Sequence, residues 1–77
     1  MILGKKITLK IINQRAEKDI KVREGLTINN LKAIVEGVLQ YKMEKIEVIQ
    51  EGKEVTGHRK LKELGLEEGH KIEIKGS

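Results

Sequence analysis

The sequence has no cysteine, proline, tryptophan or phenylalanine, and Tyr41 is its single aromatic residue. Without cysteine there can be no disulfide and no thiolate metal ligand, which is compatible with a cytoplasmic protein. Without further aromatic side chains there is little to stack on nucleic-acid bases. No apolar run approaches the roughly 20 residues that a membrane-spanning helix needs. These absences exclude a disulfide scaffold and argue against membrane insertion and base stacking.

The charge distribution and the N-terminal residues bear on nucleic-acid binding and on the cellular location. The 16 basic and 12 acidic residues give a net charge of +4, and they are mixed along the chain without a block of like charges. Such a mixture is typical of a solvated surface and does not favour nucleic-acid binding. Met1, Ile2 and Leu3 are too few for the apolar core of a signal peptide, and Lys5 and Lys6 come soon after. We therefore expect a cytoplasmic protein.

Length and composition predict one small domain over residues 1–77. A chain of this size buries only about 60% of its unfolded surface, so its core must be compact. Apolar residues make up 38% of the sequence and are almost all Ile, Leu and Val. Because β-branched side chains suit half-buried strand faces, a large share of sheet is expected.

Residues 26–39 form the only stretch with sustained helical periodicity. Thr27 precedes the apolar run, where its side-chain oxygen can cap the first turn. Gly37 costs roughly 0.5–1 kcal/mol relative to alanine in a helix, so it either packs closely against a neighbouring backbone or is an accident of the polar face. We expect a helix over about 27–40. Its apolar residues recur at three- and four-residue steps and are Ile28, Leu31, Ile34, Val35, Val38 and Leu39.

The rest of the chain is typical of short strands, in which apolar and other residues alternate. Gly52 is expected to take a left-handed conformation in a tight turn, and Gly65 lies within a single helical turn. Gly76 and Ser77 are expected to form a frayed end. The predicted strands span residues 5–13, 19–23, 45–50, 53–55 and 71–75.

The order of elements predicts the topology. Two strands, one helix and three further strands form a split crossover. Ile72 and Ile74 are too apolar for a free edge, so the last strand needs a central position. Pairing it parallel to the first strand gives that position and a right-handed crossover. The fold class is therefore α+β, with a mixed sheet packed on one helix, which is a β-grasp.

Several features in the same order resemble ubiquitin. The opening of the helix, residues 27–33, is similar to that of the ubiquitin helix, and the resemblance covers nearly the whole chain. It implies a ubiquitin-like fold but no single function, since this fold hosts many. The later matching residues are Gly52, Lys53, Val55, Arg59, Lys60, Leu61, Leu64, Gly65, Leu66, Ile72 and Ile74.

The resemblance also bears on conjugation and on the ubiquitin surface patch. Conjugated modifiers and sulfur carriers need a flexible tail ending in Gly-Gly, whereas this sequence has Gly76 followed by Ser77. Ile49 matches the central isoleucine of the ubiquitin patch, while Glu73 and Lys75 stand at its other positions in the last strand. The resemblance thus implies a non-conjugated module in which one patch residue remains.

The helix opening and the closing segment, residues 59–72, resemble the bacterial YukD/EsaB group. Members of that group are small ubiquitin-like proteins without a diglycine tail, encoded with type VII secretion machinery. The resemblance implies a cytosolic accessory or regulatory partner of that apparatus. The predicted function is therefore protein binding, in a monomer or weak dimer.

Alternation places four side chains on the exposed sheet face as a candidate protein-binding surface: Lys10, Ile12, Ile49 and Lys75. An isolated exposed isoleucine can also be incidental, because folded proteins carry many apolar surface atoms. The sequence alone leaves both interpretations of Ile49 open.

No enzyme activity, metal, cofactor or small-molecule substrate is predicted. His58 and His70 lie in polar turns, and Ser77 is the only serine, so no catalytic triad can be built. A small sheet closed over one helix is expected to leave no room for a sizeable pocket.

Four alternatives remain open at the level of sequence. The chain could be a modifier or sulfur carrier matured from a longer precursor, or a small subunit of a multicomponent oxygenase. It could also be a nucleic-acid-binding protein that uses its basic faces, or an engineered ubiquitin-like scaffold. The last idea is prompted by the absence of Pro, Cys, Phe and Trp.

Overall fold

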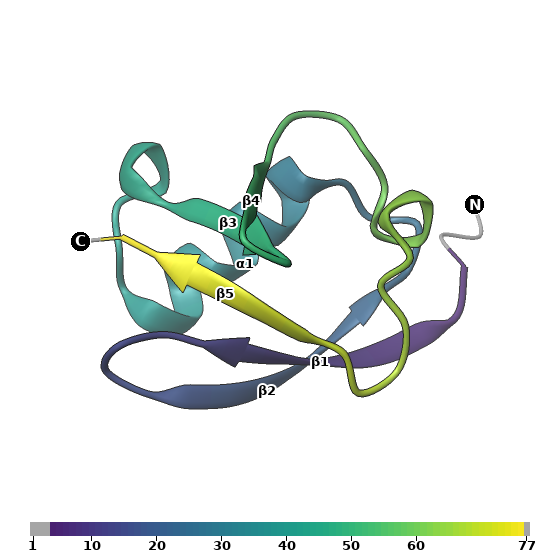
Figure 1. Cartoon of the computed structure of the whole chain (residues 1–77), viewed down its shortest axis with the longest axis horizontal. Coiled ribbons are helices and arrows are strands. Elements are labelled where there is room, and N and C mark those ends of the chain that lie inside the picture. Colours follow the sequence, from purple (N-terminus) through teal and green to yellow (C-terminus); the bar gives the residue numbers. More distant parts are fainter. Residues whose placement is uncertain (1–3, 77) are drawn as a thin grey trace.

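A computed structural model describes residues 4–76, which form a five-stranded sheet and one long helix (Figure 1). Two short 3-10 turns, Met43–Lys45 and Leu61–Leu64, lie in the connections. The predicted frayed end at Ser77 lies outside the described residues. In chain order the main elements are β1 (Lys6–Ile12), β2 (Glu17–Arg23), α1 (Ile28–Leu39), β3 (Glu47–Gln50), β4 (Lys53–Val55) and β5 (Lys71–Lys75).

The sheet has the order β2-β1-β5-β3-β4, so the last strand occupies the centre. β5 pairs parallel to β1, with Ile11 opposite Ile72, and antiparallel to β3, with Val48 opposite Ile74. The predicted β-grasp, with its mixed sheet and central last strand, is confirmed. Its physical basis is the apolar character of β5, whose Ile72 and Ile74 are each 1% exposed.

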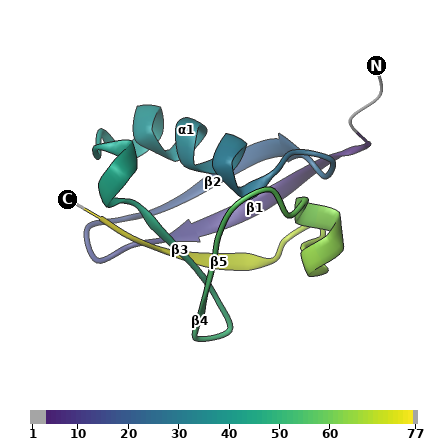
Figure 2. The ribbon, with the colours of Figure 1, turned by 90° about the horizontal axis from the view of Figure 1, so that it is seen from above.

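α1 lies across one face of the sheet and leaves the other face open (Figure 2). Thr27 caps it as predicted, because its Oγ1 accepts a hydrogen bond from the Asn30 backbone amide at 3.2 Å. The Asn30 side chain in turn accepts from the Thr27 amide at 3.1 Å. The helix ends where Gln40 adopts a left-handed conformation with φ of 59°. The observed bounds thus lie within one residue of the expected ones.

The core lies between α1 and the sheet. Three of the six residues in the predicted helix stripe are buried, and the other three are partly buried against the same cluster. Burial of this kind contributes about 25 cal/mol per Å² of apolar surface and is the main source of stability in a small domain. The buried residues are Ile7, Leu9, Ile11, Ile20, Val22, Ile28, Leu31, Val35, Tyr41, Ile46, Val48, Leu61, Leu66, Ile72 and Ile74.

The boundaries of three strands differ from the prediction, and β1 is one residue shorter at each end. β2 begins at Glu17 rather than at Asp19, because pairing with β1 continues until Ile12 faces Glu17. β3 begins at Glu47 rather than at Lys45, because the preceding residues form a 3-10 turn. The polar loop of the first hairpin is therefore shorter than the sequence pattern indicates.

The β3–β4 turn uses two left-handed residues rather than one. Glu51 has φ of 51° and Gly52 has φ of 81°. Two-residue hairpin turns favour this mirror-image geometry because it matches the twist of the strands. Sequence reasoning identified Gly52 but not Glu51, since glutamate rarely adopts positive φ.

Gly37 has no packing role. A Cβ built at this exposed position meets no atom within 4 Å. Gly37→Ala is therefore expected to raise the free energy of unfolding by about 0.5–1 kcal/mol, because alanine loses less backbone entropy in a helix. Urea unfolding followed by circular dichroism measures the change.

Gly52→Ala is the matched control for that variant. Its Cβ would also meet no atom within 4 Å, but Gly52 has φ of +81°, which alanine rarely adopts. The control should lose stability while Gly37→Ala gains it. A loss of stability in Gly37→Ala would show that the helix needs this glycine.

Candidate protein-binding surface

The four predicted surface residues lie on the outer face of the sheet, which is the face turned away from α1. Ile12 and Ile49 are half-buried, and neither belongs to the core cluster or to the apolar residues packed against it. Lys10 is also half-buried, and Lys75 is exposed. Strand alternation explains the placement, because each of these residues neighbours a buried residue that points toward the helix.

Ile12 and Ile49 belong to one row across three strands. Ile12 faces Glu73 in the β1–β5 register, and Glu73 faces Ile49 in the β3–β5 register. Because adjacent strands lie about 4.8 Å apart, the two isoleucines are separated by about 10 Å with Glu73 between them. Lys75 lies two residues beyond Glu73 on the same face. The outer face therefore combines a broken apolar row with charges of both signs.

Asn13 closes the end of the sheet beside this row. The backbone pairing of β1 with β5 ends at Ile12. Beyond it, the side chain of Asn13 makes the hydrogen bond to β5. Its Nδ2 donates to the carbonyl of Ile74 at 2.7 Å. Its Oδ1 accepts from the Tyr41 hydroxyl at 2.9 Å and from the Arg15 amide at 3.0 Å. One side chain thus joins the first turn, the end of the helix and the last strand.

Tyr41 is enclosed by this end of the molecule and is 5% exposed. The Arg15 guanidinium lies over its ring, 5.1 Å from the centroid. Gly76 packs closely as well, since a Cβ there would stand 2.8 Å from Cδ2 of Tyr41. Gly76 follows the last strand and is exposed, so a larger residue there would have to displace the tyrosine ring.

A recess of about 490 Å³ opens at the same end of the sheet. β1 ends at Ile12, opposite Glu73, while β5 extends two residues further to Lys75. The prediction that the fold leaves no room for a sizeable pocket is wrong at this point. The side chains used in the argument below are among its lining: Ile12, Asn13, Arg15, Tyr41, Glu73 and Lys75.

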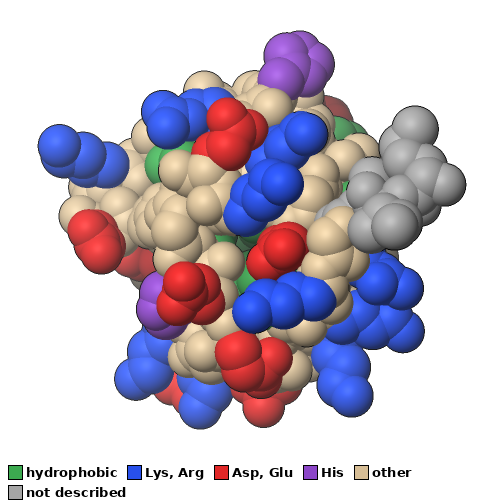
Figure 3. Space-filling view, turned by 90° about the vertical axis from the view of Figure 1, so that its right-hand side faces the viewer, with side chains coloured by type: hydrophobic (Ala, Val, Ile, Leu, Met, Phe, Trp, Pro, Cys, Tyr) green, Lys and Arg blue, Asp and Glu red, His purple; other side chains and the backbone are tan. Residues whose placement is uncertain are grey.

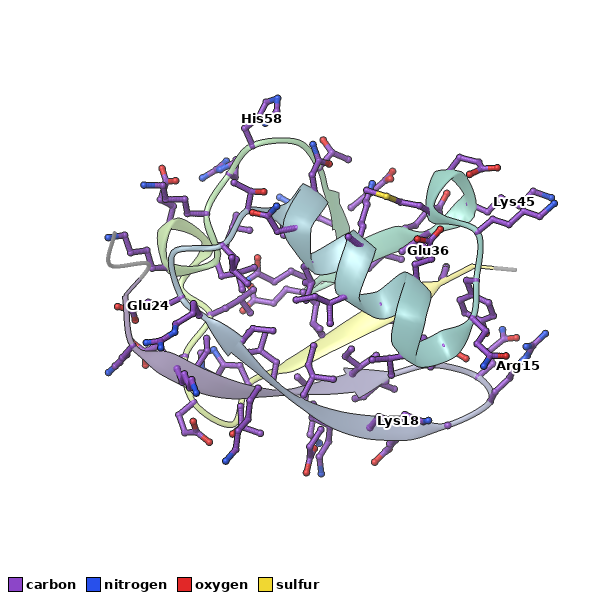
Figure 4. All side chains as sticks on the ribbon, turned by 180° about the vertical axis from the view of Figure 1, so that it is seen from behind. Arg15, Lys18, Glu24, Glu36, Lys45 and His58 are labelled. Carbon is purple, nitrogen blue, oxygen red and sulfur yellow. The ribbon has the colours of Figure 1, made fainter. Side chains whose placement is uncertain are left out.

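The two histidines are exposed, as expected for turn residues. His58 projects away from the loop that carries it (Figure 4). His70 Nδ1 accepts a hydrogen bond from the Glu67 amide at 3.1 Å, so this ring has a local structural role. Across residues 4–76, no three His, Asp or Glu side chains are grouped so that they could hold a metal.

Acidic and basic side chains are interspersed on the side of the molecule shown in Figure 3. This mixture is typical of a solvated surface rather than of a polyanion-binding face. Within the described part of the chain, no helix has both the length and the apolar character needed to cross a bilayer.

Sequence reasoning missed Asn13, Arg15 and Tyr41 as a cluster. Two signals were present in the sequence. Tyr41 is the only aromatic residue, and Asn13 immediately follows the apolar alternation of the first strand. Neither signal shows that residues 28 positions apart in the chain meet.

Comparison with known proteins identifies solved structures that are similar to this chain. Ubiquitin from Caldiarchaeum subterraneum is similar over 95% of both chains, with 14% identity and a TM-score of 0.87. The ubiquitin-like domain of Plasmodium falciparum Dsk2 is 19% identical, with a TM-score of 0.88, over 95% of this chain and 100% of that one.

A chain from the crystal structure of ATBAG1 in complex with HSP70 is 15% identical, with a TM-score of 0.86. The likeness covers 92% of this chain and 40% of that one. Among curated proteins, no sequence matches. The model of the ubiquitin family matches residues 7–77, so the chain belongs to the ubiquitin family.

Proposed function

We propose that this protein binds other proteins non-covalently through the outer face of its sheet. Ubiquitin-like domains commonly act as protein-interaction modules. The observation that carries the proposal is the row formed by Ile12, Glu73 and Ile49, in which two half-buried isoleucines lie outside the core. Covering this apolar surface with a partner would remove it from water and so favour association.

A structural neighbour supports an interaction role by analogy. The ATBAG1 structure that this chain resembles is a complex with HSP70. The proposal gives this protein a role in assembly and assigns it neither catalysis nor a cofactor. It is taken to act as a monomer or weak dimer.

The identity of the partner is a finer part of the proposal. The resemblance of the helix opening and of residues 59–72 to the YukD/EsaB group supports components of a bacterial type VII secretion system as partners. It also supports a cytoplasmic location. Affinity capture from the native host tests this part, because recovery of binding proteins without any secretion component would overturn it. The general proposal would survive that result.

Truncation of the two isoleucines tests the binding face. The partner is first captured on the wild-type protein, identified by mass spectrometry and purified, and its affinity is then measured by calorimetry. Ile49→Ala is expected to weaken binding about 5- to 30-fold, because it removes apolar surface from the contact. The Ile12→Ala/Ile49→Ala double variant should bind more weakly still.

Ile34→Ala provides the matched control. It removes the same atoms from a partly buried isoleucine, but on α1 at the opposite side of the sheet. The control should retain wild-type affinity. If the double variant binds as tightly as wild type, or if Ile34→Ala weakens binding equally, the outer face is not the binding surface.

A further inference from the structure

We propose that the recess at the end of β5 is an acidic-residue subsite of the binding surface. It would receive the carboxylate of an Asp or Glu side chain of the protein partner. This inference rests on the proposed function and specifies the chemistry of the partner. It is carried by the juxtaposition of Arg15, Tyr41 and Lys75 around one open volume of about 490 Å³.

Arg15 is held at the rim of the recess before any ligand arrives. Its amide donates to Asn13 Oδ1 at 3.0 Å, and its guanidinium lies 5.1 Å from the centroid of the Tyr41 ring. Figure 4 shows Arg15 projecting from the β1–β2 turn. A guanidinium packed over an aromatic ring still presents N–H donors in its own plane. Arg15 is exposed, so these donors face solvent and can be reached by a ligand.

Lys75 supplies a second cation from a different element. Arg15 approaches from the first turn and Lys75 from the end of β5, and both line the recess. Glu73 is the one acidic residue among the lining side chains, so positive charge is in excess there. A guanidinium can bind a carboxylate through two parallel hydrogen bonds, whereas an ammonium adds a point charge. The arrangement is therefore complementary to a single carboxylate.

The recess is continuous with the apolar row of the outer face. Ile12 belongs both to that row and to the lining of the recess. A partner segment whose apolar side chain covers Ile12 would place the next residues at the mouth of the recess. An apolar residue followed by an acidic residue is the sequence pattern that fits this surface.

Two capped dipeptides test the subsite without knowledge of the natural partner. Acetyl-Ile-Glu-amide carries the proposed carboxylate, and acetyl-Ile-Gln-amide is the same length without the charge. Each is titrated into isotope-labelled protein, and amide shifts are followed by NMR up to about 50 mM peptide, which reaches very weak affinities. The glutamate peptide should give saturable shifts at residues 13–15, 41 and 73–76, and the glutamine peptide should bind several-fold more weakly.

Three variants are expected to weaken, strengthen and leave unchanged the binding of the glutamate peptide. Arg15→Gln should weaken binding of the glutamate peptide about 3- to 5-fold, in line with exposed ion pairs. Glu73→Gln should strengthen it, because it removes a like charge from the lining. Lys62→Gln removes an exposed cation from the Leu61–Leu64 turn and should change nothing. The amide spectrum of each variant verifies its fold.

Several outcomes would overturn the subsite. These are equal responses to both peptides, a response unaffected by Arg15→Gln, no saturable response, or tighter binding of inorganic phosphate than of the glutamate peptide. The proposed function is tested independently of the subsite. If partner binding depends on Ile12 and Ile49 but not on Arg15, the subsite is wrong and the binding face stands.

Discussion

Leu31→Ala is expected to lower the free energy of unfolding by about 3–5 kcal/mol. Leu31 is 0% exposed and lies at the centre of the stripe that α1 presents to the sheet. Truncation removes apolar contacts and leaves a cavity that close-packed neighbours fill only partly. A domain of this length is stable by roughly 4–12 kcal/mol in total, so the variant loses a large share of its stability.

Urea unfolding followed by far-ultraviolet circular dichroism measures this loss. Ile49→Ala is the internal control, because Ile49 is an aliphatic residue on the outer face and outside the core. It should cost less than about 1 kcal/mol, since its side chain is only half-buried. A cost above about 2 kcal/mol for Ile49→Ala would mean that this residue is part of the core.

Asn13→Ala is expected to lower the free energy of unfolding by about 2–3 kcal/mol. The change removes three hydrogen bonds, made with Tyr41, Arg15 and the carbonyl of Ile74. The tyrosine hydroxyl and the Ile74 carbonyl are part of a closely packed end of the sheet, where an unmatched polar group is costly. For a residue in a surface turn this is a large effect, and chemical unfolding measures it.

Tyr41→Phe separates the contributions within that cluster. It removes one hydroxyl but keeps the ring, so it should cost only about 1 kcal/mol. In the double variant, the two losses should sum to more than the measured loss, because both single changes break the same Tyr41–Asn13 bond. Strictly additive losses would show that the bond contributes nothing to stability.

The order and type of the elements followed from local pattern. α1 was predictable because its apolar residues keep a helical period and Thr27 offers a cap. β5 was predicted with its observed bounds, Lys71–Lys75, because Gly69 and Gly76 enclose one alternating run. The central place of β5 followed from the apolar character of Ile72 and Ile74. Each of these features could be inferred from the composition or periodicity of one short segment.

The recess and the Asn13 cluster could not be predicted in the same way. The hydrogen bond from Asn13 to Ile74 joins residues 61 positions apart, and the one from Tyr41 spans 28 positions. Alternation put Ile12 and Ile49 on the outer face, but only the pairing register shows that Glu73 separates them. Long-range register depends on the assembled sheet, which no local pattern encodes.

The enclosure of Tyr41 makes it an optical probe of one end of the molecule. Because the chain has no tryptophan or phenylalanine, its near-ultraviolet absorption and intrinsic fluorescence come from this single ring. The ring contacts Gly76 and Arg15 and lines the recess, so we expect its emission to change when a ligand enters or when the end of β5 separates from it. The Leu61–Leu64 turn lies at the opposite end of the molecule (Figure 1), and we expect changes confined there to leave this signal unaltered.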